Sequence, residues 1–265
     1  MVSGLILVDI FFSASSFLLS FAAKGGEEAE RLLLMRDQRK IASGKMQLLV
    51  HPHALADLLA ECFHFAVDAE NVYLKKSLLH DRVGERVFDR RVSLVDDAAL
   101  RGCVRTRPFD DEGAASRRTS LVVGGVLKGF LYDSYYAHLA GRDSTGNAVR
   151  SLGSSPAVSP SNLVMAPGRK SEGQLLAAVE KGVFVKGLMG LHTMDAATGD
   201  FSLVLAEAQF VERGEVRHAV KETLVAGNFF SLLGEVEAVG KKVEHAGGGH
   251  YLPHVLFPRV KVVGA

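Results

Sequence analysis

Three histidines lie close together near the end of the chain, at His245, His250 and His254. The glycines at 247–249 separate the first two, and a flexible loop of this kind could bring the imidazoles around a transition-metal ion. Their separations of five and four residues match no common zinc-site spacing, however. The alternative hypothesis, three surface histidines in a mobile loop, needs no metal.

Three carboxylates occupy consecutive positions at Asp110, Asp111 and Glu112. Like charges at this spacing repel one another, and burial would raise the pKa of at least one of them. One hypothesis is therefore an acid/base pair or a polar strip that lines a cavity. The other is a turn whose acids are neutralised by Arg117 and Arg118.

A second polar segment contains Gly146, Asn147 and Arg150. Its amide and guanidinium groups could donate hydrogen bonds to the backbone or to a carboxylate of a substrate. The same glycine and asparagine are equally typical of a simple turn. Both interpretations stay open at this point.

Other catalytic and binding chemistries lack support in the sequence. The glycines at 124–125 are followed by no Gly-Lys-Ser/Thr and predict strand bends rather than a phosphate loop. No serine stands in a Gly-x-Ser-x-Gly context, so a serine hydrolase is not indicated. Cys62 and Cys103 make no disulfide framework, which favours a reducing, cytoplasmic location.

The overall charge is nearly balanced, with 31 Lys and Arg against 30 Asp and Glu. Such a chain has no long-range field of one sign, so we expect no binding to nucleic acid. With 48% hydrophobic and 23% charged residues, the composition is typical of a globular protein with a sizeable core.

The apolar segment 1–23 raises the question of a signal peptide, with residues 21–23 as a loose cleavage site. No basic residue precedes the apolar stretch and Asp9 lies inside it, which also disfavours a membrane span of about 20 apolar residues. Two short strands of a sheet that begins before this chain does are the simpler interpretation. We therefore expect no membrane association.

Hydrophobic periodicity predicts the elements that would position these groups. We expect helices over 25–40, 54–67, 171–181 and 229–236, the third beginning at Ser171 and stopping at Gly182. The helix over 54–67 carries a wide apolar stripe that includes Cys62, which predicts an inert buried thiol. Strands are predicted at 46–50, 120–131, 182–189, 201–210, 215–225, 255–257 and 260–263. The predicted class is α+β, a predominantly antiparallel β domain with a few helices packed on the sheets.

A series of short landmarks resembles the C-terminal domain of the TldD/PmbA, or modulator of DNA gyrase, metallopeptidases. The landmarks follow one another in the order Phe109 to Gly113, Arg117-Arg118, Gly124 to Leu127, Leu131 to Asp133, Thr145 to Arg150, Pro160 to Asn162, Thr198 to Ser202, Gly227-Asn228 and Val239-Gly240. The resemblance assigns 44–265 to this domain and 1–43 to a remnant of the family's N-terminal domain, comprising its last strands and a connecting helix.

The resemblance implies a two-subunit cytoplasmic peptidase that cleaves peptides or unfolded segments in a cavity between its subunits. Its catalytic subunit carries HExxxH, in which two imidazoles hold zinc and the glutamate acts as general base on the metal-bound water. In the present chain, Glu61 occupies the position of that glutamate, but Ala60 and Phe65 stand at the two positions where imidazoles are required. His64 is one residue out of register, which rotates its side chain by about 100° around an α-helix. The family's third ligand, a cysteine near the C-terminus, is also missing.

We therefore expect a subunit of the PmbA or TldE type without zinc of its own, acting in proteolysis or peptide maturation beside a TldD-like subunit that holds the zinc. It would hold an extended peptide at an exposed strand edge. The candidate peptide-binding residues are Asp110, Asp111, Glu112, Arg118, Asn147 and Arg150.

Two alternatives remain. One is a stand-alone peptidase with a displaced metal site built from Glu61, His64 and the histidines at 245, 250 and 254. The other is a homodimeric peptide-binding module formed by self-association.

Overall fold

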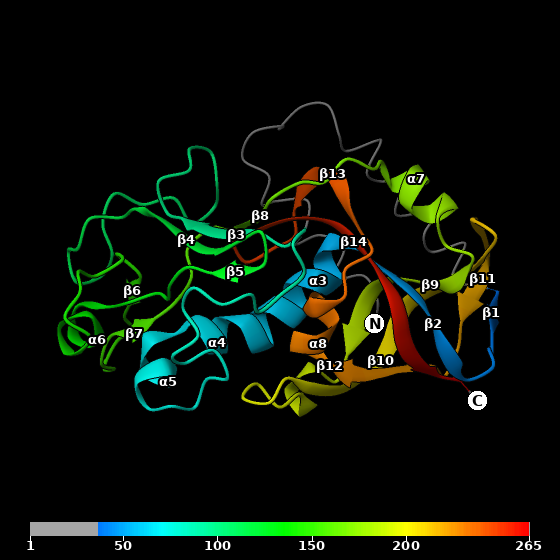
Figure 1. The fold of residues 1–265 in the computed structure, drawn as a ribbon, viewed down its shortest axis with the longest axis horizontal. Coiled ribbons are helices and arrows are strands. Elements are labelled where there is room, and N and C mark those ends of the chain that lie inside the picture. Colours follow the sequence, from blue (N-terminus) through cyan, green and yellow to red (C-terminus); the bar gives the residue numbers. More distant parts are fainter. Residues whose placement is uncertain (1–36, 265) are drawn as a thin grey trace.

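A computed structural model describes residues 37–264 of the chain, and strands dominate it (Figure 1). The main sheet contains β1 (Gln38–Arg39), β2 (Gly44–Val50), β3 (Leu94–Asp97), β4 (Arg118–Val123), β5 (Val126–Leu127), β8 (Leu163–Met165), β9 (Lys181–Met189), β10 (Asp200–Glu212), β11 (Glu215–Val220), β12 (Leu224–Asn228), β13 (Ala238–His245) and β14 (His250–Val263). A second small sheet pairs β6 (Ala148–Val149) with β7 (Ala157–Val158). Most of these pairings are antiparallel, so the predicted α+β class is confirmed.

Five of the strands close into a ring. β2 pairs with β9, β9 with β10, β10 with β12, β12 with β14, and β14 again with β2. Lys261 of β14 shows the closure directly, because it is aligned with Lys45 on one side and Ala226 on the other. The first residues of β14 extend beyond the ring and pair in parallel with β8, which leads on to β3, β4 and β5. The strand β14 therefore connects the two halves of the structure.

One broken helix crosses β14. It consists of α3 (Pro52–Leu58), the π-helical turn η1 (Leu59–Phe63) and α4 (His64–Val67). His51 caps its beginning by accepting a hydrogen bond from the His53 amide, and Pro52 occupies the first turn, where its missing N–H costs nothing. The predicted apolar stripe is fully buried, and Cys62 and Phe63 are both 0% exposed. The remaining helices are the short α5 (Ala69–Tyr73), α6 (Ser134–Leu139), η2 (Leu191–Thr193), α7 (Glu172–Ala177) and α8 (Phe229–Gly234).

Two predicted helix ends are wrong. Ser171 caps α7 as predicted, in a capping box with Gln174, but the helix ends at Ala177. Gly182 lies inside β9, where a Cβ atom would stand 2.3 Å from the backbone oxygen of Gln47, so the close approach of two strands requires the glycine. The helix predicted over 25–40 does not reach Lys40, because Gln38 and Arg39 pair with β11. The rest of that helix and the strands predicted in 1–23 lie outside the described residues.

The C-terminal strand is longer than predicted. β14 begins at His250, so His250 and His254 belong to a strand and are only 6% and 3% exposed. The prediction that these two histidines lie in a mobile surface loop is therefore wrong. Within residues 37–264, no helix is long and apolar enough to cross a membrane.

Candidate functional site

Two histidines far apart in the sequence meet where the broken helix contacts the start of β14. The Nε2 atoms of His64, at the start of α4, and His250, at the start of β14, are 3.0 Å apart. The two rings are stacked, with centroids 5.0 Å apart and an interplanar angle of 8°. The helix that resembles the family's zinc helix is thus joined directly to the C-terminal strand.

The hydrogen bonds around His250 assign its protons. Its Nδ1 atom is 3.1 Å from the backbone oxygen of Gly247, which can only accept, so this nitrogen carries the hydrogen. The Nε2 atom of neutral His250 is then an acceptor, and Nε2 of His64 must donate to it. The hydrogen-bond geometry therefore fits two neutral imidazoles.

Burial favours the neutral forms. It is the main cause that lowers the pKa of His64 to about 3, and a proton on His250 and the charge of Arg105 both act in the same direction. Burial is also the main cause that lowers the pKa of His250, with Arg105 again contributing. A guanidinium beside the pair therefore disfavours any second cation at this position.

The pair predicts a pH-dependent stability. The unfolded chain binds a proton at each imidazole near pH 6.5, whereas folded His64 excludes one until about pH 3. The unfolded state therefore binds more protons between these values, and the free energy of unfolding falls as the pH drops through this window. We expect His64→Gln to remove on the order of 1–2 kcal/mol of this loss between pH 7 and pH 5, measured by urea unfolding.

Exposed His192 provides the matched control, as His192→Gln. The difference in slope between variant and parent isolates the imidazole, because titratable groups that His64 does not contact contribute equally to both. Equal slopes for His64→Gln and the parent would contradict the assignment of a neutral, proton-excluding pair.

The outer face of the broken helix does not fit zinc. Ala60 and Glu61 are exposed and Phe65 is partly exposed, while the neighbours on the inner face are buried. The π turn, in which the His64 amide bonds to the Leu59 oxygen, brings residues five apart to successive turns of one face. Ala60 and Phe65 have that separation but no donor atom, so Glu61 has no pair of imidazoles beside it.

The other histidines and Cys62 do not complete a metal site. His254 packs edge-on against His51 with ring centroids 4.8 Å apart and faces Glu172, while the ring of His245 lies tilted against that of Tyr251. Within the described part of the chain, no three His, Cys, Asp or Glu side chains come together so as to hold a metal ion. Burial raises the pKa of the Cys62 thiol to about 11, as expected for an inert buried cysteine.

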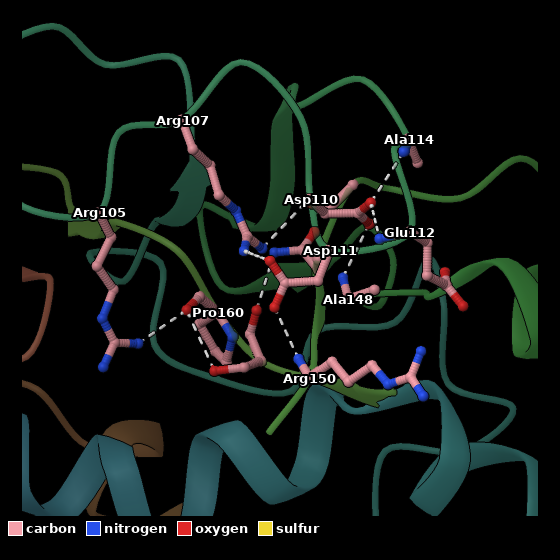
Figure 2. Close-up of polar contacts among 12 residues, drawn as sticks. Arg105, Arg107, Asp110, Asp111, Glu112, Ala114, Ala148, Arg150 and Pro160 are labelled. Carbon is pink, nitrogen blue, oxygen red and sulfur yellow. Dashed lines mark hydrogen bonds and ion pairs between the residues drawn. The ribbon is translucent and has the colours of Figure 1, made fainter. Parts of the chain in front are cut away.

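Asp110 is enclosed by backbone amides (Figure 2). Its carboxylate is 2% exposed and accepts hydrogen bonds from the amides of Glu112, Ala114 and Ala148 at 2.9–3.0 Å. It therefore ties two loops together.

The two neighbouring acids are exposed but also bind backbone amides. Asp111 accepts from the Arg150 amide at 2.7 Å, and Glu112 from the Ser134 amide at 2.7 Å. The expected neutralisation by Arg117 and Arg118 is wrong, because the arginine near this cluster is Arg107, 3.8 Å from Asp111.

Asn147 also lies inside the fold, in a network that the sequence did not reveal. Its Nδ2 atom donates to Asp96 at 2.7 Å, and Asp96 further accepts from the amide and hydroxyl of Ser161. Burial raises the pKa of Asp96, and these hydrogen bonds oppose that rise. Arg118 and Arg150, in contrast, keep exposed side chains, and a peptide-binding role for the candidate residues stays a prediction.

Comparisons with known proteins agree on one family. The model of the PmbA/TldA metallopeptidase C-terminal domain matches residues 43–264. Uncharacterized protein MJ0231 of Methanocaldococcus jannaschii is 34% identical over 210 residues, covering 77% of this chain and 49% of that protein. Metalloprotease PmbA of Escherichia coli O157:H7 is 28% identical over 240 residues, covering 91% of this chain and 50% of that protein.

Solved structures give the same result. TldE from Thermococcus kodakarensis superposes with a TM-score of 0.86 at 26% identity, covering 92% of this chain and 55% of that chain. A modulator of a DNA gyrase from Thermotoga maritima MSB8 also superposes with a TM-score of 0.86, at 32% identity, covering 94% and 56%. The chain spans about half the length of the curated relatives it matches.

Proposed function

Because the chain belongs to the PmbA/TldA metallopeptidase family, we propose that it is a subunit without catalytic zinc that pairs with a zinc-bearing, TldD-like homologue. The pair would act in the cytoplasm on peptides or unfolded segments, in proteolysis or peptide maturation. The observation that carries this proposal is the outer face of the broken helix, where Ala60 and Phe65 offer no metal ligand on either side of Glu61.

The structure supplies positions that suit a supporting subunit. β7 pairs only with β6 among the described strands, so its outer edge is a candidate for the addition of an extended peptide strand. The His64–His250 hydrogen bond fixes the broken helix to β14 without a metal. This contact supports a structural role for the helix here, in place of the catalytic role that HExxxH would give it.

A paired glutamate substitution tests the proposal. We expect cleavage of an unfolded peptide when the chain is mixed with an HExxxH-bearing homologue. Glu61→Gln in this chain should change the rate by less than twofold, because Ala60 and Phe65 provide no metal ligands on either side of it. Glu→Gln in the HExxxH motif of the homologue should abolish cleavage, because the loss of a general base typically costs about 10²–10⁴-fold.

The alternatives predict other results. Cleavage by the isolated chain that is lost with Glu61→Gln or His64→Gln would support a stand-alone peptidase and contradict the proposal. Self-association without any capture of the homologue would support the homodimeric binding module instead.

A further inference from the structure

Arginines are concentrated in two loops beside the broken helix, residues 98–118 and 149–152, which we call the arginine loops. They contain Arg101, Arg105, Arg107, Arg117, Arg118 and Arg150. All are exposed except the half-buried Arg107. The whole chain has a net charge of only +1, so this concentration is local.

The acids of the arginine loops do not neutralise these arginines. Asp110, Asp111 and Glu112 direct their carboxylates at backbone amides. The ion pairs of the loops are long, 3.8 Å for Arg107–Asp111 and 4.0 Å for Arg118–Asp97. The guanidinium groups therefore keep most of their hydrogen-bonding capacity.

Two arginines show this spare capacity directly. Among residues 37–264, the exposed side chains of Arg101 and Arg117 make no hydrogen bond or ion pair. Their donors are therefore free to meet an incoming acceptor, whereas Arg107 is already engaged with Asp111 and with the Gly146 oxygen.

Exposed apolar side chains alternate with the arginines. Phe109 is 60% exposed and Leu152 is fully exposed, and each lies within two residues of an arginine. The other large apolar side chains that are exposed in these loops are Leu100, Val104 and Val149. A surface of this kind presents both guanidinium donors and apolar contact area.

The first arginine loop is bonded to the start of β14, where His250 contacts the broken helix. The amide of Val104 donates to the Tyr251 hydroxyl at 3.0 Å, and the amide of Arg105 donates to Asn162. The side chain of Arg105 also donates to the backbone oxygen of Pro160 (Figure 2). These bonds hold the first loop against the start of β14, beside His250 and His64.

We propose that the arginine loops bind an acidic, unfolded peptide segment in which Asp or Glu alternates with apolar residues. Guanidinium groups bind carboxylates in a bidentate manner, and the apolar side chains cover the intervening residues. A single nucleic-acid strand would instead require several aromatic platforms for base stacking, and Phe109 is the only exposed aromatic residue in these loops. The inference rests on the proposed function, for which it names the class of peptide.

Fluorescence anisotropy on the complete chain tests the inference with three labelled probes: an unstructured Glu/Leu/Phe peptide, its Lys-for-Glu counterpart and a single-stranded oligonucleotide. We expect the acidic peptide to bind at least tenfold more tightly than either of the others. Arg101→Ala combined with Arg117→Ala should weaken its binding at least fivefold. The control, Arg90→Ala combined with Arg259→Ala, removes two other exposed arginines and should change it less than twofold.

Equal affinity for the acidic and basic peptides, tighter binding of the oligonucleotide, or equal loss in both double variants would overturn the inference. Co-purification with the HExxxH-bearing homologue, measured on the same variants, separates this result from the proposed function. Loss of acidic-peptide binding with pairing intact supports the docking surface. Failure of the unchanged chain to pair contradicts the proposed function, whichever peptide the loops prefer.

Discussion

Asp110→Ala is expected to lower the free energy of unfolding by about 3–5 kcal/mol, because it leaves three backbone amides without their charged acceptor. The carboxylate is 2% exposed and bonds to the amides of Glu112, Ala114 and Ala148. Water cannot easily replace it there. For a domain whose total stability is typically about 5–15 kcal/mol, such a loss is large, and urea unfolding measures it.

The same experiment separates the two hypotheses for the acidic cluster. Asp143→Ala removes an exposed carboxylate that makes no hydrogen bond or ion pair among the described residues, and should cost less than about 0.5 kcal/mol. If Asp110→Ala were as mild as this control but abolished binding of a peptide, Asp110 would be a ligand-binding residue and its structural assignment would be contradicted.

The second large effect concerns the broken helix. Introducing Ala60→His and Phe65→His together places imidazoles five residues apart around Glu61, and the π turn brings such positions to one face. Two histidines on one face of a helix are a common basis for zinc binding. We therefore expect at least tenfold tighter zinc binding than in the unchanged chain, measured by competition with a chromophoric chelator.

The control supplies only one of the two introduced imidazoles. Phe65→His combined with His53→Gln leaves the number of histidines unchanged and should give no such gain. If the unchanged chain bound zinc as tightly as the Ala60→His, Phe65→His variant, then Ala60 and Phe65 would not be the cause of the missing site.

Local patterns predicted most of the fold. The apolar stripe of 54–67 identified the broken helix and its buried face, because helical periodicity depends only on near neighbours. Local patterns also predicted the strands β9 and β10 and the helix cap at Ser171. The end of α7 was predicted wrongly because Gly182 was interpreted as a helix stop. The glycine is instead required by the close approach of the Gln47 backbone on another strand, a contact that no local pattern contains.

The candidate site was less predictable. The partners His64 and His250 are 186 residues apart in the sequence, and only the path of β14 brings them together. The acids at 110–112 suggested ion pairs with neighbouring arginines, whereas backbone amides supply their partners. Backbone donors leave no signature in side-chain composition, so the sequence favoured the wrong partner.

Elemental analysis of zinc in the purified chain, alone and after co-expression with an HExxxH-bearing homologue, tests the central claim most directly. We predict less than about 0.1 zinc per chain in isolation, and one zinc per pair in the complex, bound to the homologue. One zinc per isolated chain, lost with His64→Gln, would contradict this prediction and would assign a metal site to the His64–His250 pair.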